Sequence, residues 1–352
     1  MRVTEVDNIT IKDIAKAAGV STATVSYVIN GTKTVTPERQ KRVLDVIAKT
    51  GYQPNAVAQS LRTKKTKTIG ILVEDILAFS APRIINGISE YMEKTEYHIL
   101  LNDLRMLDSL FNRYDQIVHQ KDKINRELNF LVYGAKVDAV IYVGMFDRDI
   151  TGVIPDINKP VIIAYSTSED AHTCFVTYEN ENISTEITRH LIDAGHRNIA
   201  VISGLAHTPP AQQRLKGVHR AFSEAGIVLN SQMVKNGDWE RDSGYFCMKD
   251  LLSEATLPTA VFVMNDIMAI GAMDAIKEAG LRVPEDISII GFDNRDVSEY
   301  VSPKLTTAEI DLKAIGYTAA QTVVEKLSGK NKSENRITIP SKMIFRETVD
   351  KI

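Results

Sequence analysis

The sequence predicts two unlike parts, an all-α helix-turn-helix module and a larger α/β body with parallel sheets. Residues 10–51 hold three short stretches with apolar residues at helical spacing. From residue 68 onward, short apolar strands alternate with amphipathic helices. The charge changes at the same place, because residues 1–66 carry 11 lysines and arginines against 5 acidic residues, whereas the remainder carries 31 against 40. At 352 residues, the chain is also longer than one compact domain usually is.

The first two predicted helices are joined by a tight turn. Thr10 and Asp13 have the spacing of a capping box, which starts a helix. Gly19 can adopt the positive φ that ends this helix, and Ser21 can cap a second helix over residues 22–30.

The second helix has one apolar face and one face of small or polar residues. Val25, Val28 and Ile29 are expected to point inward. The residues expected to point outward are Thr22, Ala23, Ser26 and Tyr27. Such a helix can enter the major groove of DNA, although an ordinary surface hairpin of helices has the same pattern.

A third helix is predicted from Thr36 and Pro37 to the glycine at position 51. It is followed by a segment of small residues at 56–61 and by a basic linker at 63–67. The positive charge of this part favours a phosphate-bearing partner, but a solvated basic surface would have the same charge.

Residues 10–70 resemble the DNA-binding headpiece and hinge of the lac repressor (LacI) family of bacterial transcription regulators. The segments that carry the resemblance are TIKDIAKAAGVSTATVSYVIN, TPERQKRV and GYQPNAVAQSLRTKKTKTIG. Their order and spacing are far more specific than a single helix-turn-helix pattern. The resemblance implies a sequence-specific regulator of transcription, and the habit of the family favours a repressor.

The resemblance also implies how DNA is contacted. Two subunits are expected to bind the two halves of a pseudo-palindromic operator in double-stranded DNA. The base edges would be contacted by Thr22, Ala23 and Tyr27. The residues expected to lie on phosphates are Thr10, Ser21, Thr24, Ser26 and Asn30. Residues 55–62 match the family's hinge helix, whose expected DNA contacts are Asn55, Ala58 and Leu61, the last as a wedge in the minor groove.

The predicted strands of the body cover residues 69–73, 98–102, 139–143, 161–165, 198–204, 260–264 and 287–291, with a last strand over 337–345. Helices are expected between them, among others over 84–95, 183–194, 215–225, 243–252 and 268–279. This alternation predicts doubly wound parallel sheets. The length of this part favours two similar lobes over one sheet.

This part resembles the periplasmic-binding-protein fold, in which two Rossmann-like lobes enclose a ligand cleft. The resemblance rests on motifs such as HLIDAGHRNIAVISG, TAVFVMNDIMAIGAM and GLRVPEDISIIGFDN. We therefore expect a headpiece over residues 1–53, a hinge helix and linker over 54–67, and an effector-binding and dimerisation domain over 68–352. The N-lobe is expected at about 68–165 and 295–325, and the C-lobe at about 166–294 and 326–352.

The expected effector contacts follow the ends of strands, where ligands of open α/β sheets bind. Asp293 can bind two neighbouring hydroxyls, Arg214 offers a planar set of donors, and Trp239 can stack on a sugar face. The resemblance places seven residues at effector-contacting positions: Ala81, Pro82, Arg83, Arg214, Trp239, Asn265 and Asp293. Tyr165 is added because it stands at a strand end where many relatives have an acid or an arginine.

Simpler explanations compete with two of these assignments. Trp239 could belong to the core, and Asp266 is expected to cap the following helix rather than to touch a ligand. A sugar or sugar derivative is the expected effector, whereas the extra charge of Arg83 would suit an anionic or phosphorylated one.

The sequence contains none of the motifs G-x-x-x-x-G-K-[ST], G-x-S-x-G, H-E-x-x-H or G-x-G-x-x-G. His172 and Cys174 form the one close His/Cys pair and lack the further ligands of a zinc site. We therefore expect a protein that is not an enzyme and that holds no cofactor and no metal.

Two cysteines, a polar first segment and the lack of a long apolar run predict a cytoplasmic protein with no membrane contact. Because no leucine heptads follow the last predicted strand, a homodimer is expected rather than a tetramer.

Residues 104–135 resemble the family least. They carry many charges, with apolar residues at helical intervals, which predicts one long exposed helix or two shorter ones. A structural elaboration explains them most simply, and a docking surface for a protein corepressor is the alternative. For the whole chain, the rival function is a cytoplasmic sugar-binding sensor that acts through a protein partner. A carbohydrate-modifying enzyme would need an acid/base pair, and none can be identified.

Overall fold

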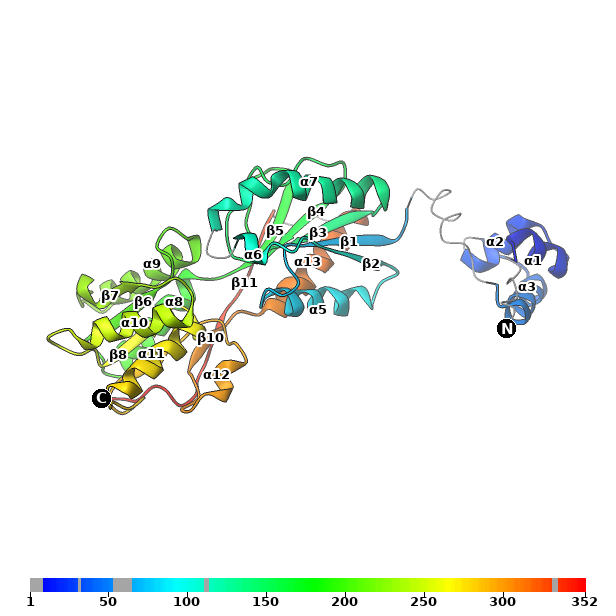
Figure 1. The fold of residues 1–352 in the computed structure, drawn as a ribbon. Helices are drawn as coiled ribbons and strands as arrows, with labels where there is room; N and C mark the ends of the chain where they lie inside the picture. Colours follow the sequence, from blue (N-terminus) through cyan, green and yellow to red (C-terminus); the bar gives the residue numbers. More distant parts are fainter. Residues whose placement is uncertain (1–8, 31–32, 53–64, 111–113, 331–334) are drawn as a thin grey trace, which may run out of the picture. The chain divides into compact units, whose positions relative to one another are not determined.

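The computed structural model describes residues 9–30, 33–52, 65–110, 114–330 and 335–352. The chain divides into two compact units, Met1–Thr66 and Lys67–Ile352, which we call the headpiece and the body (Figure 1). The predicted hinge contacts Asn55, Ala58 and Leu61 lie outside the described residues.

The headpiece contains the three predicted helices, α1 (Ile11–Ala18), α2 (Thr22–Asn30) and α3 (Pro37–Thr50). Helices of this length are marginal on their own in water, so they depend on packing against each other. Their shared core consists of five buried residues, Ile14, Ala15, Ala18, Val25 and Val43.

The predicted helix ends of the headpiece are confirmed. The Asp13 carboxylate accepts hydrogen bonds from the hydroxyl and the backbone N–H of Thr10, at 2.6 and 2.9 Å, and these bonds lower the pKa of Asp13. Gly19 ends α1 with φ +63°. The Ser21 hydroxyl caps α2, because its oxygen accepts the backbone N–H of Thr24 at 3.1 Å.

The first sheet of the body has six parallel strands in the order β11-β5-β4-β3-β1-β2. Their bounds are β1 (Thr68–Val73), β2 (His98–Asp103), β3 (Ala139–Val143), β4 (Val161–Ala164), β5 (Thr173–Tyr178) and β11 (Arg336–Ile339). Helices α5 (Ala81–Met92) and α13 (Leu312–Leu327) cover one face, and α7 (Lys121–Asn129) covers the other (Figure 1). Because both faces are covered, the central strands are apolar throughout.

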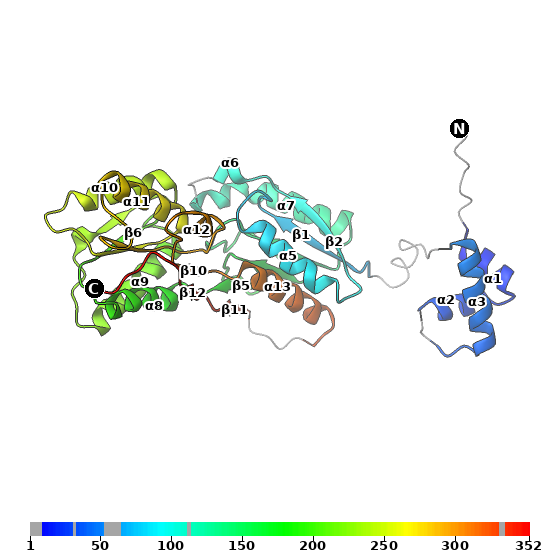
Figure 2. The same ribbon diagram turned by 90° about the horizontal axis from the view of Figure 1, so that it is seen from below.

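The second sheet has four parallel strands in the order β7-β6-β8-β9. They are β6 (Ile199–Ser203), β7 (Val234–Asn236), β8 (Ala260–Val263) and β9 (Ser288–Ile290). Helices α8 (Glu181–Asp193) and α9 (Pro209–Glu224) lie on one side, and α10 (Arg241–Leu252) and α11 (Asp266–Glu278) on the other (Figure 2). The prediction of a two-lobed body with doubly wound parallel sheets is confirmed.

The described chain passes between the two lobes after β5, after β10 (Thr307–Glu309) and after β11. The last passage leads into β12 (Lys342–Ile344), which pairs antiparallel with β10. Strands β5 and β11 therefore belong to the first sheet, although residues 166–294 and 326–352 were expected in the C-lobe. Conversely, residues 295–309 stay with the second lobe, because Thr306 and Glu309 bridge to Ile290 and Asp293.

Two features of the sequence explain these differences. Strand β5 has the mixed sequence TCFVTY, which shows no apolar run, yet all six residues are buried. Pro340 interrupts the predicted strand 337–345, so that it forms β11 in one lobe and β12 in the other.

Residues 104–135 form a series of short helical elements instead of the one long exposed helix or the two shorter helices that were expected. They contain α6 (Leu107–Leu110), a 3₁₀ helix (Tyr114–Gln120), α7 and one π-helical turn (Phe130–Gly134). Apolar residues at helical spacing bind this segment to the core, among them the fully buried Ile124, Leu128 and Leu131. The remaining short elements are a 3₁₀ turn (Ser231–Met233) and α12 (Val297–Tyr300). Across the described residues, no helix has the length and apolar character that crossing a membrane requires.

Candidate functional site

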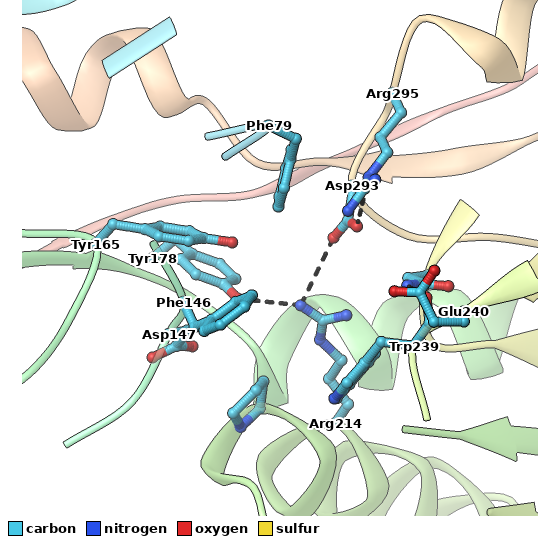
Figure 3. Close-up of a pocket in the computed structure, with 12 residues that line it drawn as sticks. Phe79, Phe146, Asp147, Tyr165, Tyr178, Arg214, Trp239, Glu240, Asp293 and Arg295 are labelled. Atoms are coloured by element: carbon cyan, nitrogen blue, oxygen red, sulfur yellow. Dashed lines mark hydrogen bonds and ion pairs between the residues drawn. The ribbon is translucent and has the colours of Figure 1, made fainter. Parts of the chain in front are cut away.

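A pocket lies where the two lobes of the body face each other (Figure 3). Its walls come mostly from the loops at the carboxyl ends of the parallel strands of both sheets, the usual place for a ligand in this architecture. The lining residues are Phe79, Phe146, Asp147, Tyr165, Tyr178, Pro210, Arg214, Trp239, Glu240, Asn265, Asp293 and Arg295.

Arg214, in the second turn of α9, is the most strongly fixed residue of the pocket. Its side chain is 3% exposed. The guanidinium donates from Nε to Asn180 Oδ1 at 2.8 Å, from Nη2 to the Tyr178 hydroxyl at 3.0 Å, and from Nη1 to the Met264 carbonyl. Its plane also lies on the Phe292 ring, with 3.6 Å between the guanidinium carbon and the ring centre. These contacts hold the planar guanidinium of Arg214 in one orientation at the pocket.

Asp293 lies between two arginines. Its carboxylate is 3.8 Å from Arg214 Nη2 and 3.5 Å from Arg295 Nε. The backbone at Asp293 has φ +108°, and its N–H donates to the Ala308 carbonyl at 2.8 Å. Burial raises the pKa of Asp293, while Arg214 and Arg295 act against that shift. The carboxylate is therefore held in an unusual backbone position that directs it toward the pocket (Figure 3).

Aromatic rings form the wall that the first lobe contributes. Tyr165 stacks on Tyr178 with 5.6 Å between ring centres and 17° between planes. Phe79 meets Tyr165 edge to face at 6.3 Å. Burial raises the pKa of both tyrosines, so their hydroxyls stay neutral donors near neutral pH. Tyr165 itself has φ +76°, which places a strained residue at the end of β4.

Asp147 is a second buried carboxylate, located after β3. The Asn180 side-chain amide donates to it at 2.9 Å, and the same Asn180 accepts from Arg214. Burial raises the pKa of Asp147, and the hydrogen bond from Asn180 opposes that shift. The charge of Arg214 and the Tyr178 hydroxyl act in the same direction as Asn180. A carboxylate has about four acceptor positions, so Asp147 can also accept a hydrogen bond from a ligand.

Trp239 forms part of the opposite wall. Its indole lies directly on Gly204, where an added Cβ would come 2.1 Å from a ring carbon. The ring also contacts the apolar core, so the expected core role and the pocket role coexist. The indole N–H has no hydrogen-bond partner among the described residues.

The expected role of Asp266 as the cap of α11 is corrected, whereas Asn265 lines the pocket. Asn265, not Asp266, caps α11, because its Oδ1 accepts the Met268 N–H at 2.8 Å. Its amide donates to the Trp239 carbonyl at 2.8 Å. Asp266 accepts from the Thr307 hydroxyl and the Arg295 N–H instead, at 2.6 and 2.7 Å. Burial, followed by the nearby charge of Asp293, raises the pKa of Asp266 to about 7.

The pocket contains five of the eight residues predicted to contact an effector: Tyr165, Arg214, Trp239, Asn265 and Asp293. Ala81 is fully buried at the start of α5, and Pro82 and Arg83 are not among the lining residues. Arg83 forms an ion pair with Asp296 and donates to the Asn294 carbonyl at 3.4 Å, which joins the two lobes. Arg83 therefore adds no charge to the lining of this pocket.

The prediction missed seven lining residues, namely Phe79, Phe146, Asp147, Tyr178, Pro210, Glu240 and Arg295. For four of them, the position in the sequence next to a predicted strand or contact was a usable signal. Phe146 and Asp147 follow the predicted strand 139–143, and Arg295 and Glu240 lie within two residues of predicted contacts. Tyr178 was missed together with strand β5.

In the headpiece, the predicted DNA-facing residues differ in exposure. Thr10, Ser21, Thr22 and Ala23 are exposed, and Thr24 and Tyr27 are half-buried. The Lys33 ammonium lies 5.1 Å from the centre of the Tyr27 ring. Ser26 is only 8% exposed, which contradicts the expected outward position. The Asn30 side chain lies outside the described part of the structure.

Two family models match the two parts of the chain. Residues 10–55 match the model described as bacterial regulatory proteins, lacI family, and residues 188–349 match a periplasmic binding protein-like domain. Similar proteins cover nearly the whole chain. The HTH-type transcriptional repressor PurR of Pasteurella multocida is 35% identical over 342 residues, which are 97% of this chain and 98% of the relative. Catabolite control protein A of Priestia megaterium is 34% identical over 343 residues, or 97% and 99%.

The chain is also similar in fold to solved structures of transcription regulators. The lac repressor dimer bound to operator and the anti-inducer ONPF has a TM-score of 0.75 and 26% identity, with 98% of this chain and 100% of that chain covered. A complex of the transcriptional regulator CelR with cellobiose has a TM-score of 0.65 and 25% identity, with 97% and 99% covered.

Proposed function

The chain belongs to the lacI family of bacterial regulatory proteins, and on that premise we propose that it represses transcription from an operator under the control of a small-molecule effector. The headpiece binds the operator through the amino-terminal part of α2. The effector binds in the pocket between the two lobes of the body, and its binding changes the affinity for the operator. Such a ligand shifts DNA binding only by its differential affinity for the two states, typically 1–3 kcal/mol.

The observation that carries the effector site is the pair of Arg214 and Asp293. Both side chains are less than a tenth exposed, and both face the pocket (Figure 3). Removing two charges from water is costly, and their separation of 3.8 Å recovers little of that cost as a direct hydrogen bond. A ligand hydroxyl that joins both groups would complete the pair, which supports binding as the purpose of this arrangement.

The lining supports an uncharged effector with several hydroxyls. Three carboxylates, Asp147, Glu240 and Asp293, face two arginines. Because the carboxylates outnumber the arginines, a phosphate in the pocket would meet repulsion that a neutral ligand avoids. The aromatic walls suit the apolar faces of sugar rings. We therefore propose a neutral sugar or sugar derivative, in place of the anionic effector that Arg83 suggested.

We further propose that the protein acts as a homodimer in the cytoplasm and catalyses no reaction. The lac repressor structure to which the chain is similar is a dimer bound to operator, and its similar relatives include named repressors. Two headpieces related by a twofold axis would fit the two halves of a pseudo-palindromic site.

Binding to the region upstream of the gene tests the DNA-binding role. The full-length protein is mixed with a labelled duplex of that region, with and without heparin as competitor. A repressor retains the duplex at a heparin concentration that removes a random duplex of equal length. A sensor that acts through a protein partner would show no difference between the two duplexes.

A thermal-shift screen tests the effector class. Neutral mono- and disaccharides are compared with the corresponding sugar phosphates, because a ligand in excess raises the melting temperature of the state that it binds. The proposal expects a shift with a neutral sugar and none with its phosphate. A shift with phosphorylated sugars alone would contradict the proposed class.

A further inference from the structure

We propose that Lys16, Arg39 and Arg42 form a seat for one or two phosphates of the DNA backbone, beside the amino end of the recognition helix α2. This inference rests on the proposed DNA-binding function and adds contacts that the sequence did not suggest. The predicted phosphate contacts were hydroxyl and amide side chains, whereas the seat supplies positive charge. We call these three residues the basic seat.

An open hollow lies on the surface where the three helices of the headpiece meet. It is lined by Ala15, Lys16, Gly19, Val20, Ser21, Thr24, Arg39 and Arg42. Lys16 comes from the last turn of α1, Ser21 and Thr24 from the start of α2, and the two arginines from the first half of α3. Residues from three elements thus converge on one concave surface, which is not the case for an ordinary exposed lysine or arginine.

An arginine of α3 lies against the turn between α1 and α2. The Nη1 atom of Arg42 is 3.6 Å from the place that a Cβ on Gly19 would occupy. The guanidinium of Arg42 therefore lies at this turn, next to the start of α2.

The charges of the hollow are of one sign. Its lining contains three cationic side chains and no carboxylate. None of the three has an ion pair within 4 Å in the described part of the headpiece, and all are exposed. The nearest acid along α1, Asp13, already accepts two hydrogen bonds from Thr10. An anion entering the hollow would meet uncompensated positive charge.

Two hydroxyls complete the seat. Ser21 Oγ and Thr24 Oγ1 lie 2.9 Å apart and hydrogen-bond to each other at the first turn of α2. One of the two hydroxyl protons is therefore free to donate outward. The positive end of the α2 dipole adds to the field of the basic side chains. The combination of guanidinium, ammonium and hydroxyl donors fits a phosphodiester, which has two acceptor oxygens and one negative charge.

The location gives the seat its role. Thr22 and Ala23, which are expected at the base edges, follow directly after Ser21, so a phosphate in the seat would fix the depth and angle of α2 in the groove. Such a contact is independent of base sequence and adds to all duplex binding. It also adds binding energy to a helix whose expected base contacts, Thr22, Ala23 and Tyr27, include no arginine.

The experiment measures binding of the full-length protein to a labelled random-sequence duplex of 30 base pairs, by fluorescence anisotropy at 50 to 200 mM KCl. The variants are Arg39→Gln, Arg42→Gln and Lys16→Gln. The control is Lys49→Gln, which removes the same charge from the other end of α3, where it is exposed. Arg39→Lys keeps the charge, and thermal unfolding confirms that each variant is folded.

The proposal expects the slope of log affinity against log salt to fall by about 0.9 for each phosphate that a variant no longer binds, in at least Arg39→Gln and Arg42→Gln. Lys49→Gln should keep the slope of the unchanged protein, and Arg39→Lys should recover most of it. The inference is overturned if the two arginine variants change the slope no more than the control does. If the unchanged protein binds no duplex at all, the proposed function fails and the inference fails with it.

Discussion

The Nη2 atom of Arg214 and the Oδ1 atom of Asp293 lie 3.8 Å apart at the centre of the pocket, farther than a direct hydrogen bond. Neither group is free to close the gap. Arg214 is held by Asn180 and Tyr178, and the buried Asp293 carboxylate faces Arg295 with its other oxygen at 3.5 Å. A hydroxyl can accept from the guanidinium and donate to the carboxylate at once, which makes this pair the expected anchor of an effector.

Replacing Asp293 by Asn should separate effector binding from DNA binding. Asn keeps the shape and tolerates the φ of +108° better than most residues. A hydrogen bond to a charged group contributes about 1.5–3 kcal/mol, so the half-maximal effector concentration should rise roughly 10- to 100-fold. Operator affinity without effector should stay nearly unchanged, as measured by anisotropy. An undiminished effector response would remove Asp293 from the site.

Trp239 offers an intrinsic reporter of the pocket, because it is the only tryptophan of the chain. Effector binding should change the fluorescence of the indole, which lines the pocket. Gly204→Ala should abolish or shift this signal, since the new Cβ would lie 2.1 Å from the indole and displace it. We expect a loss of effector binding while operator binding persists. If Gly204→Ala binds effector as before, the position of the indole does not matter for the ligand.

Asp266 should make the stability of the body depend on pH. Its pKa is raised to about 7 by burial, so the folded protein keeps a proton that the unfolded chain releases above pH 4. The free energy of unfolding should therefore fall as the pH rises from about 4 to 7, and the effect should level off above that. The free energy of unfolding should change by a few kcal/mol at most over this range, because one pKa unit corresponds to about 1.4 kcal/mol.

The variant Asp266→Asn isolates this contribution, because Asn is neutral at every pH and keeps an acceptor for the Thr307 hydroxyl. Denaturation with urea at pH 5 and pH 8 should show a smaller pH dependence in the variant than in the unchanged protein. Equal pH dependence in both would show that Asp266 is not buried as a neutral acid.

Arg83 and Asp296 connect the two lobes beside the pocket, and both are partly exposed. Exposed ion pairs contribute about 1 kcal/mol or less, so Arg83→Asp alone should weaken effector binding only a few-fold. The exchanged pair, Arg83→Asp with Asp296→Arg, should restore most of the loss in a Trp239 fluorescence titration. If the exchanged pair binds no better than the single variant, the contact does not assist closure of the lobes.

Much of the fold could be predicted because local signals and tertiary structure agree. In the headpiece, the caps at Thr10, Ser21 and Gly19 determine helix ends by hydrogen bonds within a few residues. In the body, most strands are buried on both faces and therefore consist of apolar runs. Such runs can be recognised in a single sequence. Strand β5 was not predicted, because it contains the polar residues Thr173 and Thr177. Both are buried by tertiary packing, which a local sequence pattern does not show.

Part of the site could be predicted from chemical types and matching motifs, which identified Arg214, Trp239 and Asp293. Asp147 was missed although it follows the predicted strand 139–143, because a place after a strand does not show which side chains enter the pocket. Phe79 was missed because its place in the pocket arises from the approach of two lobes. The cap of α11 was assigned to Asp266 instead of Asn265, because a pattern does not resolve which of two adjacent polar residues begins a helix.

Selection from a random duplex library shows whether the headpiece recognises a defined DNA sequence. The full-length protein is immobilised, and bound duplexes are recovered, amplified and sequenced over several rounds. We expect enrichment of one pseudo-palindromic sequence with two equivalent half-sites. A bound pool with the composition of the starting library would show that the headpiece does not select a sequence.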